Sequence, residues 1–250
     1  MILRTTNLSR RFGGLKAVDA VSFAASTAAV QSIIGPNGAG KTTFFNLVTG
    51  AIPADDGNIV FQDEDVTGKT PDQLVTRGLV RTFQRTSIFK SFSAIENVSL
   101  AIRSREGLNA ALRLPREHER RIADEARDVL AEVGLSGREG TIAANLAHGS
   151  QRALDIAIGL ASRPKIILMD EPLAGMSRGD RARIGALIVK LRDKMKLAVV
   201  LVEHDIGMVM RLSDRITVMQ HGRVIAEGAP TEIHSDPAVR KAYLHGSFAT

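Results

Sequence analysis

The stretch that decides the fold is Gly35-Pro36-Asn37-Gly38-Ala39-Gly40-Lys41-Thr42-Thr43. It matches the phosphate-binding pattern G-x-x-x-x-G-K-[ST] at every defined position. Residues 31–34 end in an apolar pair and follow Ala29-Val30, which predicts a buried strand before the loop. Residues 43–48 predict a helix after it, with Gly50 as the stop. A strand that enters such a loop and continues as a helix is the context in which this pattern binds phosphate.

The residue types in this stretch explain the chemistry. Glycines let the backbone turn its N–H groups toward an anion, and the helix that follows points its positive end at the same place. Lys41 can reach the β- and γ-phosphates of a nucleotide, and the Thr42 hydroxyl can bind Mg²⁺. The alternative is a glycine-rich turn that contains Lys-Thr by chance, and the strand–loop–helix context disfavours it.

The composition narrows the class of protein. The 250 residues are 44% hydrophobic and 24% charged, which is ordinary for one large or two small globular domains. A net charge of +6 is compatible with a nucleotide, an acidic lipid or a nucleic acid and selects none of them. The chain has no cysteine, which excludes a disulfide framework, a zinc–thiolate site and a cysteine nucleophile. We expect no signal peptide and no membrane span, because no apolar run reaches 18 residues.

Upstream and downstream of the loop, short apolar runs predict further strands. Residues 2–6 and 17–24 predict two strands joined by a turn over residues 10–14. Phe12 in this turn is either a platform for a nucleotide base or a hydrophobic contact that closes the hairpin, and the local sequence alone favours the contact. Residues 58–61 and 79–84 predict two more strands, and a short helix between them begins at Thr70-Pro71 and ends at Gly78.

Residues 85–155 differ from the rest of the chain in their pattern of apolar and charged residues. Apolar residues such as Ile122, Ala126 and Leu130 follow helical spacing. Acidic residues are interspersed among the basic ones over residues 103–127, which indicates a solvated helical face rather than a nucleic-acid surface. We therefore predict one domain of residues 1–250. In it, a nucleotide-binding core of residues 1–84 and 156–250 carries a helical subdomain of residues 85–155.

Two later strands end in polar side chains that can do chemistry. Residues 166–169 are four apolar residues in a row, typical of a strand buried on both faces, and Asp170-Glu171 follow them. Residues 197–202 predict a second buried strand, with His204 just beyond its end. Because ligands bind at the carboxyl ends of strands in open α/β sheets, we expect these side chains to meet the phosphate loop. The alternatives are acids that only solvate a loop and a histidine with a purely structural role.

With these residues located, the chain resembles the ATP-binding subunits of ABC transporters over its whole length. The elements appear in that family's order: the phosphate loop, Gln84, Leu146-Ala147-His148-Gly149-Ser150, residues 166–171, Ala174-Gly175-Met176 and His204. The resemblance implies an α/β P-loop NTPase fold of the ABC type. That fold has a mainly parallel central sheet, an antiparallel N-terminal β part and a helical subdomain.

The resemblance also implies roles for individual residues in binding and hydrolysing ATP with Mg²⁺. Phe12 would stack on adenine, and Gln84 would touch Mg²⁺ and the attacking water. Asp170 would hold Mg²⁺ through water, together with the Thr42 hydroxyl. Glu171 would activate the attacking water as general base, and His204 would contact the γ-phosphate.

A closer resemblance points to the ATPases of high-affinity branched-chain amino acid importers, a group that also serves urea and short amides. It rests on Arg81-Thr82-Phe83-Gln84, on Pro172-Leu173-Ala174-Gly175-Met176 and on the ending over residues 236–244. The lipopolysaccharide-export ATPase has a similar ending. A soluble ABC-type ATPase that acts on nucleic acid usually has two cassettes or a long insertion, and this chain has neither. A nucleotide-binding protein without hydrolysis is disfavoured by the presence of both Glu171 and His204.

One motif departs from the family pattern. The family's signature usually reads Leu-Ser-Gly-Gly-Gln and grips the γ-phosphate held by the partner subunit's loop. Here it reads Leu146-Ala147-His148-Gly149-Ser150, so the serine hydroxyl, one glycine and the glutamine are replaced. Because importers of this group usually pair two different ATPase subunits, we expect a partner ATPase and slow hydrolysis by this chain alone.

The remaining expectations concern the membrane. Ile88, Phe89, Phe92 and Ile95 form an apolar cluster that a soluble monomer rarely exposes without a partner. We expect these side chains to be exposed, and we expect Phe89 and Phe92 to lie near a groove that receives a cytoplasmic helix of an integral membrane permease. The alternative is a small core under the helical subdomain. The resemblance implies a peripheral protein at the cytoplasmic face of the inner membrane, linked indirectly to a solute-binding protein, with no nucleic-acid partner.

Overall fold

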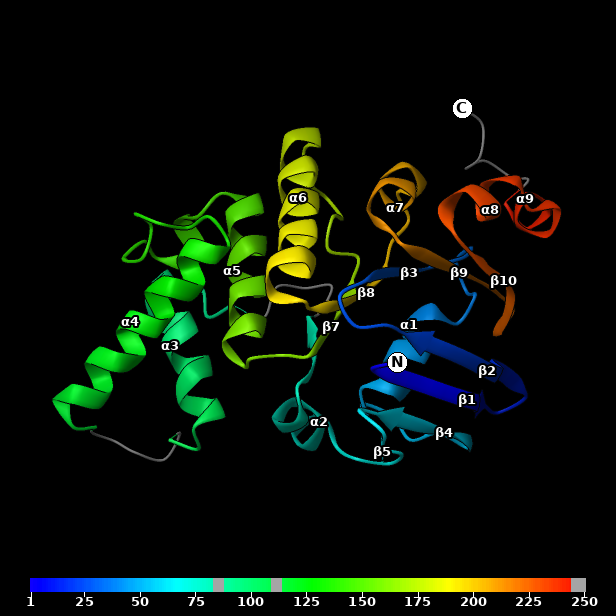
Figure 1. Cartoon of the computed structure of the whole chain (residues 1–250), viewed down its shortest axis with the longest axis horizontal. Helices are drawn as coiled ribbons and strands as arrows, with labels where there is room; N and C mark the ends of the chain where they lie inside the picture. Colours follow the sequence, from blue (N-terminus) through cyan, green and yellow to red (C-terminus); the bar gives the residue numbers. More distant parts are fainter. Residues whose placement is uncertain (83–87, 109–113, 244–250) are drawn as a thin grey trace.

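The computed structural model describes residues 1–82, 88–108 and 114–243, and it contains two sheets and a set of helices (Figure 1). The strands are β1 (Leu3–Phe12), β2 (Leu15–Ala25), β3 (Val30–Ile34), β4 (Asp56–Phe61), β5 (Glu64–Asp65), β6 (Leu79–Thr82), β7 (Ile166–Asp170), β8 (Ala198–Val202), β9 (Arg215–Gln220) and β10 (Arg223–Gly228). The helices are α1 (Lys41–Val48), α2 (Pro71–Arg77), α3 (Ala94–Arg105), α4 (Arg116–Glu132), α5 (His148–Ala161), α6 (Arg178–Met195), α7 (Ile206–Leu212), α8 (Pro230–Ser235) and α9 (Pro237–Ala242). A 3₁₀ turn at Ala143–Asn145 precedes α5.

The larger sheet brings the predicted site residues to one edge. Its strand order is β10-β9-β3-β8-β7-β6, and β6, β7, β8, β3 and β9 run parallel to their neighbours, while β10 is antiparallel to β9. Every residue of β3, β7 and β8 is buried, as expected for apolar strands covered on both faces. Because these three strands are parallel, the phosphate loop, Glu171 and His204 all follow the same edge of the sheet.

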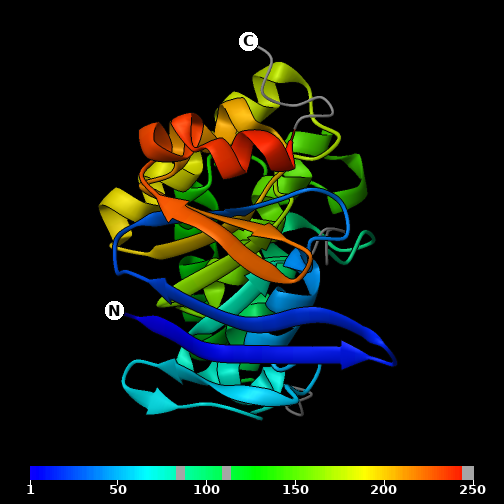
Figure 2. The same ribbon diagram turned by 90° about the vertical axis from the view of Figure 1, so that its right-hand side faces the viewer.

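The smaller sheet is antiparallel, with the order β2-β1-β4-β5 (Figure 2). The predicted strands over residues 2–6 and 17–24 are too short, and the predicted turn over residues 10–14 is too long. Phe12 pairs with Leu15, so the strands of the hairpin continue to the two-residue turn Gly13-Gly14. Gly13 has a φ of 56°, which a tight turn of this kind requires and which glycine adopts without steric cost.

The helices α3, α4 and α5 pack together at the end of the molecule opposite β1 and β2 (Figure 1). The predicted helix around Ile122, Ala126 and Leu130 is α4, and these three side chains are fully or almost fully buried in the core between the helices. Helix α5 continues from this cluster to the central sheet, so the predicted boundary after residue 155 falls inside it. Among the helices of the described residues, none is both long and apolar enough to cross a membrane.

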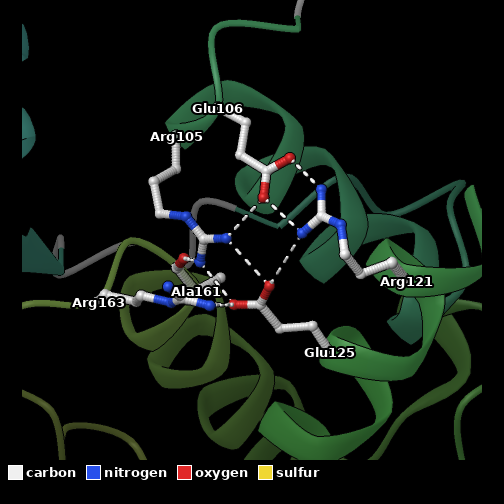
Figure 3. Close-up of polar contacts among 6 residues, drawn as sticks. All are labelled: Arg105, Glu106, Arg121, Glu125, Ala161 and Arg163. Carbon is white, nitrogen blue, oxygen red and sulfur yellow. Dashed lines mark hydrogen bonds and ion pairs between the residues drawn. The ribbon is translucent and has the colours of Figure 1, made fainter. Parts of the chain in front are cut away.

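A network of ion pairs joins the ends of these helices (Figure 3). Arg105 at the end of α3 donates hydrogen bonds to Glu125 of α4 at 2.6 Å and to the carbonyl of Ala161 at 2.8 Å, at the end of α5. A cation at the C-terminus of a helix stabilises the exposed carbonyls there. Glu106 accepts hydrogen bonds from both Arg105 and Arg121, at 3.0 and 2.9 Å. The network therefore fixes α3, α4 and α5 relative to one another.

Candidate active site

The phosphate loop is shaped by glycines for which no other residue can substitute without strain. Gly40, directly before α1, has a φ of 97°, and a Cβ there would lie 2.2 Å from the carbonyl oxygen of Ala17. Gly35, directly after β3, has a φ of 156°, and a Cβ there would lie 2.1 Å from the carbonyl oxygen of Met219. The close approach of β2 and β9 to the loop therefore requires glycine at both ends of the motif.

Lys41 is the first residue of α1 and is only 6% exposed. Its Nζ donates hydrogen bonds to the carbonyls of Gly35 and Pro36, at 2.7 and 3.0 Å. Burial lowers the pKa of Lys41, whereas the carboxylates of Glu171 and Asp170 oppose that shift. The ammonium group therefore lies against the main chain of the loop, where it can exchange carbonyl oxygens for phosphate oxygens.

The loop borders a cavity of about 440 Å³, within the size range of small-molecule sites. Its lining residues are Phe12, Leu15, Lys16, Ala17, Asn37, Gly38, Ala39, Gly40, Lys41, Thr42, Thr43, Glu171, His204 and His221. Phe12 is 48% exposed, and the guanidinium of Arg10 lies 5.1 Å from the centre of its ring. An aromatic ring beside the phosphate loop suits a base-stacking platform better than a contact that only closes the hairpin, and stacking stays a prediction.

Glu171 and His204 meet above this cavity, as the strand pattern predicts. The N–H of Glu171 donates a hydrogen bond to the carbonyl of Val202 at 2.8 Å, which ties the end of β7 to the end of β8. Glu171 has a φ of 49°, an uncommon conformation for a residue other than glycine. Its Oε1 lies 2.8 Å from Nε2 of His204. The carboxylate is thus held at a set position beside the phosphate loop, where it could accept a proton from water.

Asp170 is buried at the end of β7 and paired with Arg81, to which the sequence argument gave no role in the site. Its Oδ2 accepts a hydrogen bond from Nη2 of Arg81, in β6, at 2.8 Å. Arg81 also donates to Oδ1 of Asn46 in α1, and its guanidinium lies 5.7 Å from the centre of the Phe45 ring. Arg81 therefore links the acidic strand end to the helix that follows the phosphate loop.

The oxygen ligands that the protein offers at this site suit Mg²⁺ only if phosphate oxygens complete the coordination. Among the described residues, no group of three or more His, Cys, Asp or Glu side chains could hold a metal ion. Thr42, at the exposed start of α1, and Asp170 supply one hydroxyl and one carboxylate. Mg²⁺ is commonly bound by one or two carboxylates together with substrate phosphates and water, so this pair fits it. Gln84, the third predicted ligand, lies outside the described residues.

The signature segment lies at the start of α5. Ala147 is the N-cap of that helix, and no side chain there accepts a hydrogen bond from the first turn. His148 is exposed beside Gly175, with its Cε1 at 3.8 Å from where a Cβ of Gly175 would lie. Gly149 is buried, because Asp180 and Arg183 of α6 cover it. None of the residues 147–150 is among those that line the cavity at Lys41.

The apolar cluster after Gln84 is only partly exposed. Ile88 is 8% exposed and belongs to the core beneath α3 and α5, and Ile95 packs against that core, so the prediction that they are exposed is wrong. Asn97 of α3 explains the difference, because its side chain accepts from the N–H of Phe89 and donates to its carbonyl, at 2.8 and 3.0 Å. This anchors the segment with Ile88 inward. Phe89 and Phe92 remain 52% and 41% exposed, stacked at a centroid distance of 5.4 Å.

The site consists of a phosphate loop, an acidic strand end and a histidine around one cavity. Similarity to known proteins shows the family to which the chain belongs. The sequence pattern of the ABC transporter family matches residues 18–174. The chain belongs to this family. A second pattern, described as branched-chain amino acid ATP-binding cassette transporter, matches residues 223–244 of the cassette. The described residues of this range include β10, α8 and α9. The range also contains residues 236–244, the C-terminal motif on which the resemblance in sequence rests.

Individual relatives match this chain over nearly its whole length. The chain is 40% identical over 248 residues to the high-affinity branched-chain amino acid transport ATP-binding protein BraF of Pseudomonas aeruginosa, and the match covers 97% of each chain. It is 38% identical over 248 residues to the LivG protein of the same description from Escherichia coli, again covering 97% of each chain. These matches confirm the resemblance inferred from the motifs.

Solved structures confirm the fold. An ATP-binding cassette of an ABC transporter in its ADP conformation superposes with a TM-score of 0.87 and 34% identity, covering 98% of this chain and 99% of the other. A nucleotide-free ATP-binding cassette gives a TM-score of 0.85 and 33% identity, with the same coverage. The α/β fold predicted from the loop and the buried strands is therefore that of ABC cassettes.

Proposed function

We propose that this chain binds ATP with Mg²⁺ and hydrolyses it to ADP and phosphate, and that it powers solute import through a membrane permease. The observation that carries the proposal is the common cavity of Lys41, Glu171 and His204. One side of the cavity offers the N–H groups and the ammonium group of the phosphate loop, and the other offers a carboxylate. This combination can bind a triphosphate and activate water beside its last phosphate.

Each residue of the site has a role in this chemistry. The main chain of Gly35-Pro36-Asn37-Gly38-Ala39-Gly40 and the ammonium of Lys41 would bind the phosphates, with Thr42 and Thr43 at the start of α1. Asp170, Thr42 and Gln84 would hold Mg²⁺, which supplies charge neutralisation on the phosphates when bound. Glu171 would take a proton from the attacking water, and His204, 2.8 Å from it, would orient that carboxylate and contact the γ-phosphate. Phe12 would stack on the base.

For the solute, we propose branched-chain amino acids. The support is the printed description of the relatives that match over 97% of the chain, together with the C-terminal pattern over residues 223–244. Urea or a short amide is the alternative, because the motifs of that group are shared. Membrane and solute-binding subunits would select the solute, and this chain would supply the hydrolysis that drives transport.

For the partners, we propose a permease and a second ATPase subunit at the cytoplasmic face of the membrane. The exposed pair Phe89 and Phe92 would contact a cytoplasmic helix of the permease. A groove of about 630 Å³ is lined by residues of α2, α5 and the C-terminal part of α3, and neither ring lines it. The signature segment at Ala147, which lies away from the cavity of its own chain, would complete the nucleotide site of the second ATPase. The helical subdomain would carry both contacts.

Two substitutions test the proposed hydrolysis. Lys41→Ala removes the buried cation of the loop, so ATP binding should weaken and turnover should vanish. Glu171→Gln keeps the shape but removes the base, so turnover should fall about 10²–10⁴-fold while ATP still binds. The matched control is Glu117→Gln, at an exposed position of α4, which should leave both unchanged. Wild-type turnover in Lys41→Ala and Glu171→Gln would exclude the proposed function.

A further inference from the structure

A buried carboxylate that the proposed mechanism does not use lies between β8 and α7. Glu203 is 4% exposed. Its Oε1 accepts a hydrogen bond from the N–H of Leu173 at 2.8 Å, and its Oε2 accepts one from the N–H of His204 at 3.1 Å. Burial raises the pKa of Glu203, and the backbone N–H groups of Leu173 and His204 oppose the shift. A carboxylate in such a place is costly unless hydrogen bonds compensate for the lost water.

The two acceptor bonds connect the two segments that hold the proposed base and its histidine. Leu173 follows Glu171 by two residues, and Ala174 donates back to the carbonyl of Glu171 at 3.2 Å. His204 contacts Glu171 through its ring at 2.8 Å. These contacts form a closed circuit. It leads from Glu171 along the chain to Leu173, from Leu173 to Glu203, from Glu203 to His204, and from the imidazole of His204 back to Glu171.

A buried cation holds the same segment from the other side. Arg152 of α5 is 3% exposed and donates hydrogen bonds to the carbonyls of Pro172 at 3.1 Å and Asp170 at 3.3 Å. It is also paired with Asp155 at 2.9 Å. The carbonyls on both sides of Glu171 are thus bound by Arg152, and the amide two residues later is bound by Glu203. This matters because Glu171 has a positive φ, a conformation that persists only where its surroundings enforce it.

We propose that Glu203 is a positioning residue for ATP hydrolysis, which holds the loop after Glu171 and the main chain of His204 so that the base and the histidine face each other. The inference rests on the proposed function of the site. Glu203 does not line the cavity and acts through its neighbours, so its loss should reduce the rate of the chemical step and leave ATP binding intact. A misplacement of about 1 Å can reduce a rate by about 10²-fold.

The primary test is Glu203→Gln. An amide presents one acceptor and one donor, so it can keep only one of the two bonds from Leu173 and His204. We expect kcat for ATP to fall about tenfold to a hundredfold, with KM and the affinity for a fluorescent ATP analogue within about twofold of wild type. Val200→Ala, a buried position of the same strand, is the control for lost stability and should lower Tm with kcat within about twofold.

A double-mutant cycle separates positioning from a merely structural effect. If Glu203 acts by positioning Glu171, through Leu173 and through His204, then Glu203→Gln should change kcat by no more than about threefold in a Glu171→Gln background. Equal fold losses in both backgrounds would overturn the proposal. Glu203→Asp keeps the charge near Arg152 but shortens the reach, and it replaces Glu203→Gln in the cycle if the amide variant fails to fold.

The outcomes distinguish this inference from the proposed function. If Lys41→Ala and Glu171→Gln abolish turnover while Glu203→Gln retains the wild-type kcat, the positioning role is wrong and the proposed function stands. If neither Lys41→Ala nor Glu171→Gln affects turnover, the proposed function itself fails. A loss of ATP affinity in Glu203→Gln equal to its loss of kcat would also overturn the positioning role.

Discussion

The start of α5 offers a substitution with two separable effects. Ala147 is its N-cap and cannot accept a hydrogen bond from the first turn, so Ala147→Ser adds the missing acceptor. A serine cap in place of alanine stabilises a helix by about 0.5–2 kcal/mol. In a chain of this size each kcal/mol shifts the melting temperature by about 2–4 °C. Ala147→Ser should therefore raise Tm by about 2–4 °C for a cap of average strength.

The second effect of Ala147→Ser is on turnover. The residue at 147 is exposed and lies away from the cavity of its own chain, so in the proposed dimer it faces the nucleotide held by the other subunit. A hydroxyl that donates to a charged phosphate is worth about 1.5–3 kcal/mol, and 1.4 kcal/mol is a factor of about ten. The ATPase rate of the isolated protein, in which two copies present the same segment to each other, should rise at least about tenfold. Co-expression with a second ATPase subunit that has a full signature should also raise the rate at the site that contains Glu171.

Ala147→Asp is the matched control, because aspartate caps a helix as well as serine does. Its negative charge repels the phosphate, so it should raise Tm like serine but lower turnover. An increase in turnover with both variants would mean that helix stability alone limits the rate. If the isolated protein already matches the full complex and Ala147→Ser changes nothing, then Ala147 is no handicap and the argument for unequal sites is wrong.

Two further predictions concern the helical part of the molecule. Phe89→Glu and Phe92→Glu should leave ATP binding intact but detach the protein from permease-containing membranes, measured by co-sedimentation. Met195→Glu, at an exposed apolar position at the end of α6, is the control and should leave membrane binding unchanged. Retained membrane binding in the Phe89 and Phe92 variants would place the docking surface elsewhere. Arg121 and Arg105 lower the pKa of Glu106 from 4.5 to about 2 (Figure 3), so its contribution to stability is complete above about pH 4.5 and is lost as pH falls toward 2. The Tm difference between wild type and Glu106→Gln should therefore shrink as pH falls through this range, while Asp128→Asn, an exposed change on α4, should show no such trend.

Much of the fold follows from local signals in the sequence. The phosphate loop, the apolar strands β7 and β8, and the caps at Thr70 and Ser177 are encoded within a few residues, so they can be predicted. The strand ends of the first hairpin do not follow from local signals, because Arg10 and Arg11 are polar and only their pairing with β2 includes them in the sheet. Local sequence does not predict that Ile88 is buried, because the direction in which that segment faces depends on its tertiary contact with Asn97.

The contacts that hold the site come from distant parts of the chain. Arg81 binds a carboxylate 89 residues away, and Glu203 binds an amide 30 residues away. In the sequence, Glu203 stands at the end of an apolar run and is followed by His204 and Asp205, so nothing local distinguishes it as buried. A charged residue inside a predicted buried strand, as Arg81 is in β6, is the one local sign that a partner must exist, because such a residue is rarely buried unpaired.

Burial of charge locates the site independently of any motif. In the part of the chain that the structure describes, five ionisable residues are at most 6% exposed, namely Lys41, Arg152, Asp155, Asp170 and Glu203, and the side chain of Arg81 is 8% exposed. All five belong to contacts around the phosphate loop and the end of β7, either directly or through Arg152. Each buried charge carries a desolvation cost of several kcal/mol that pairing only partly offsets. These buried charges lie at one edge of one sheet, where their contacts hold the site residues in place. The motifs found in the sequence include only two of the five, Lys41 and Asp170.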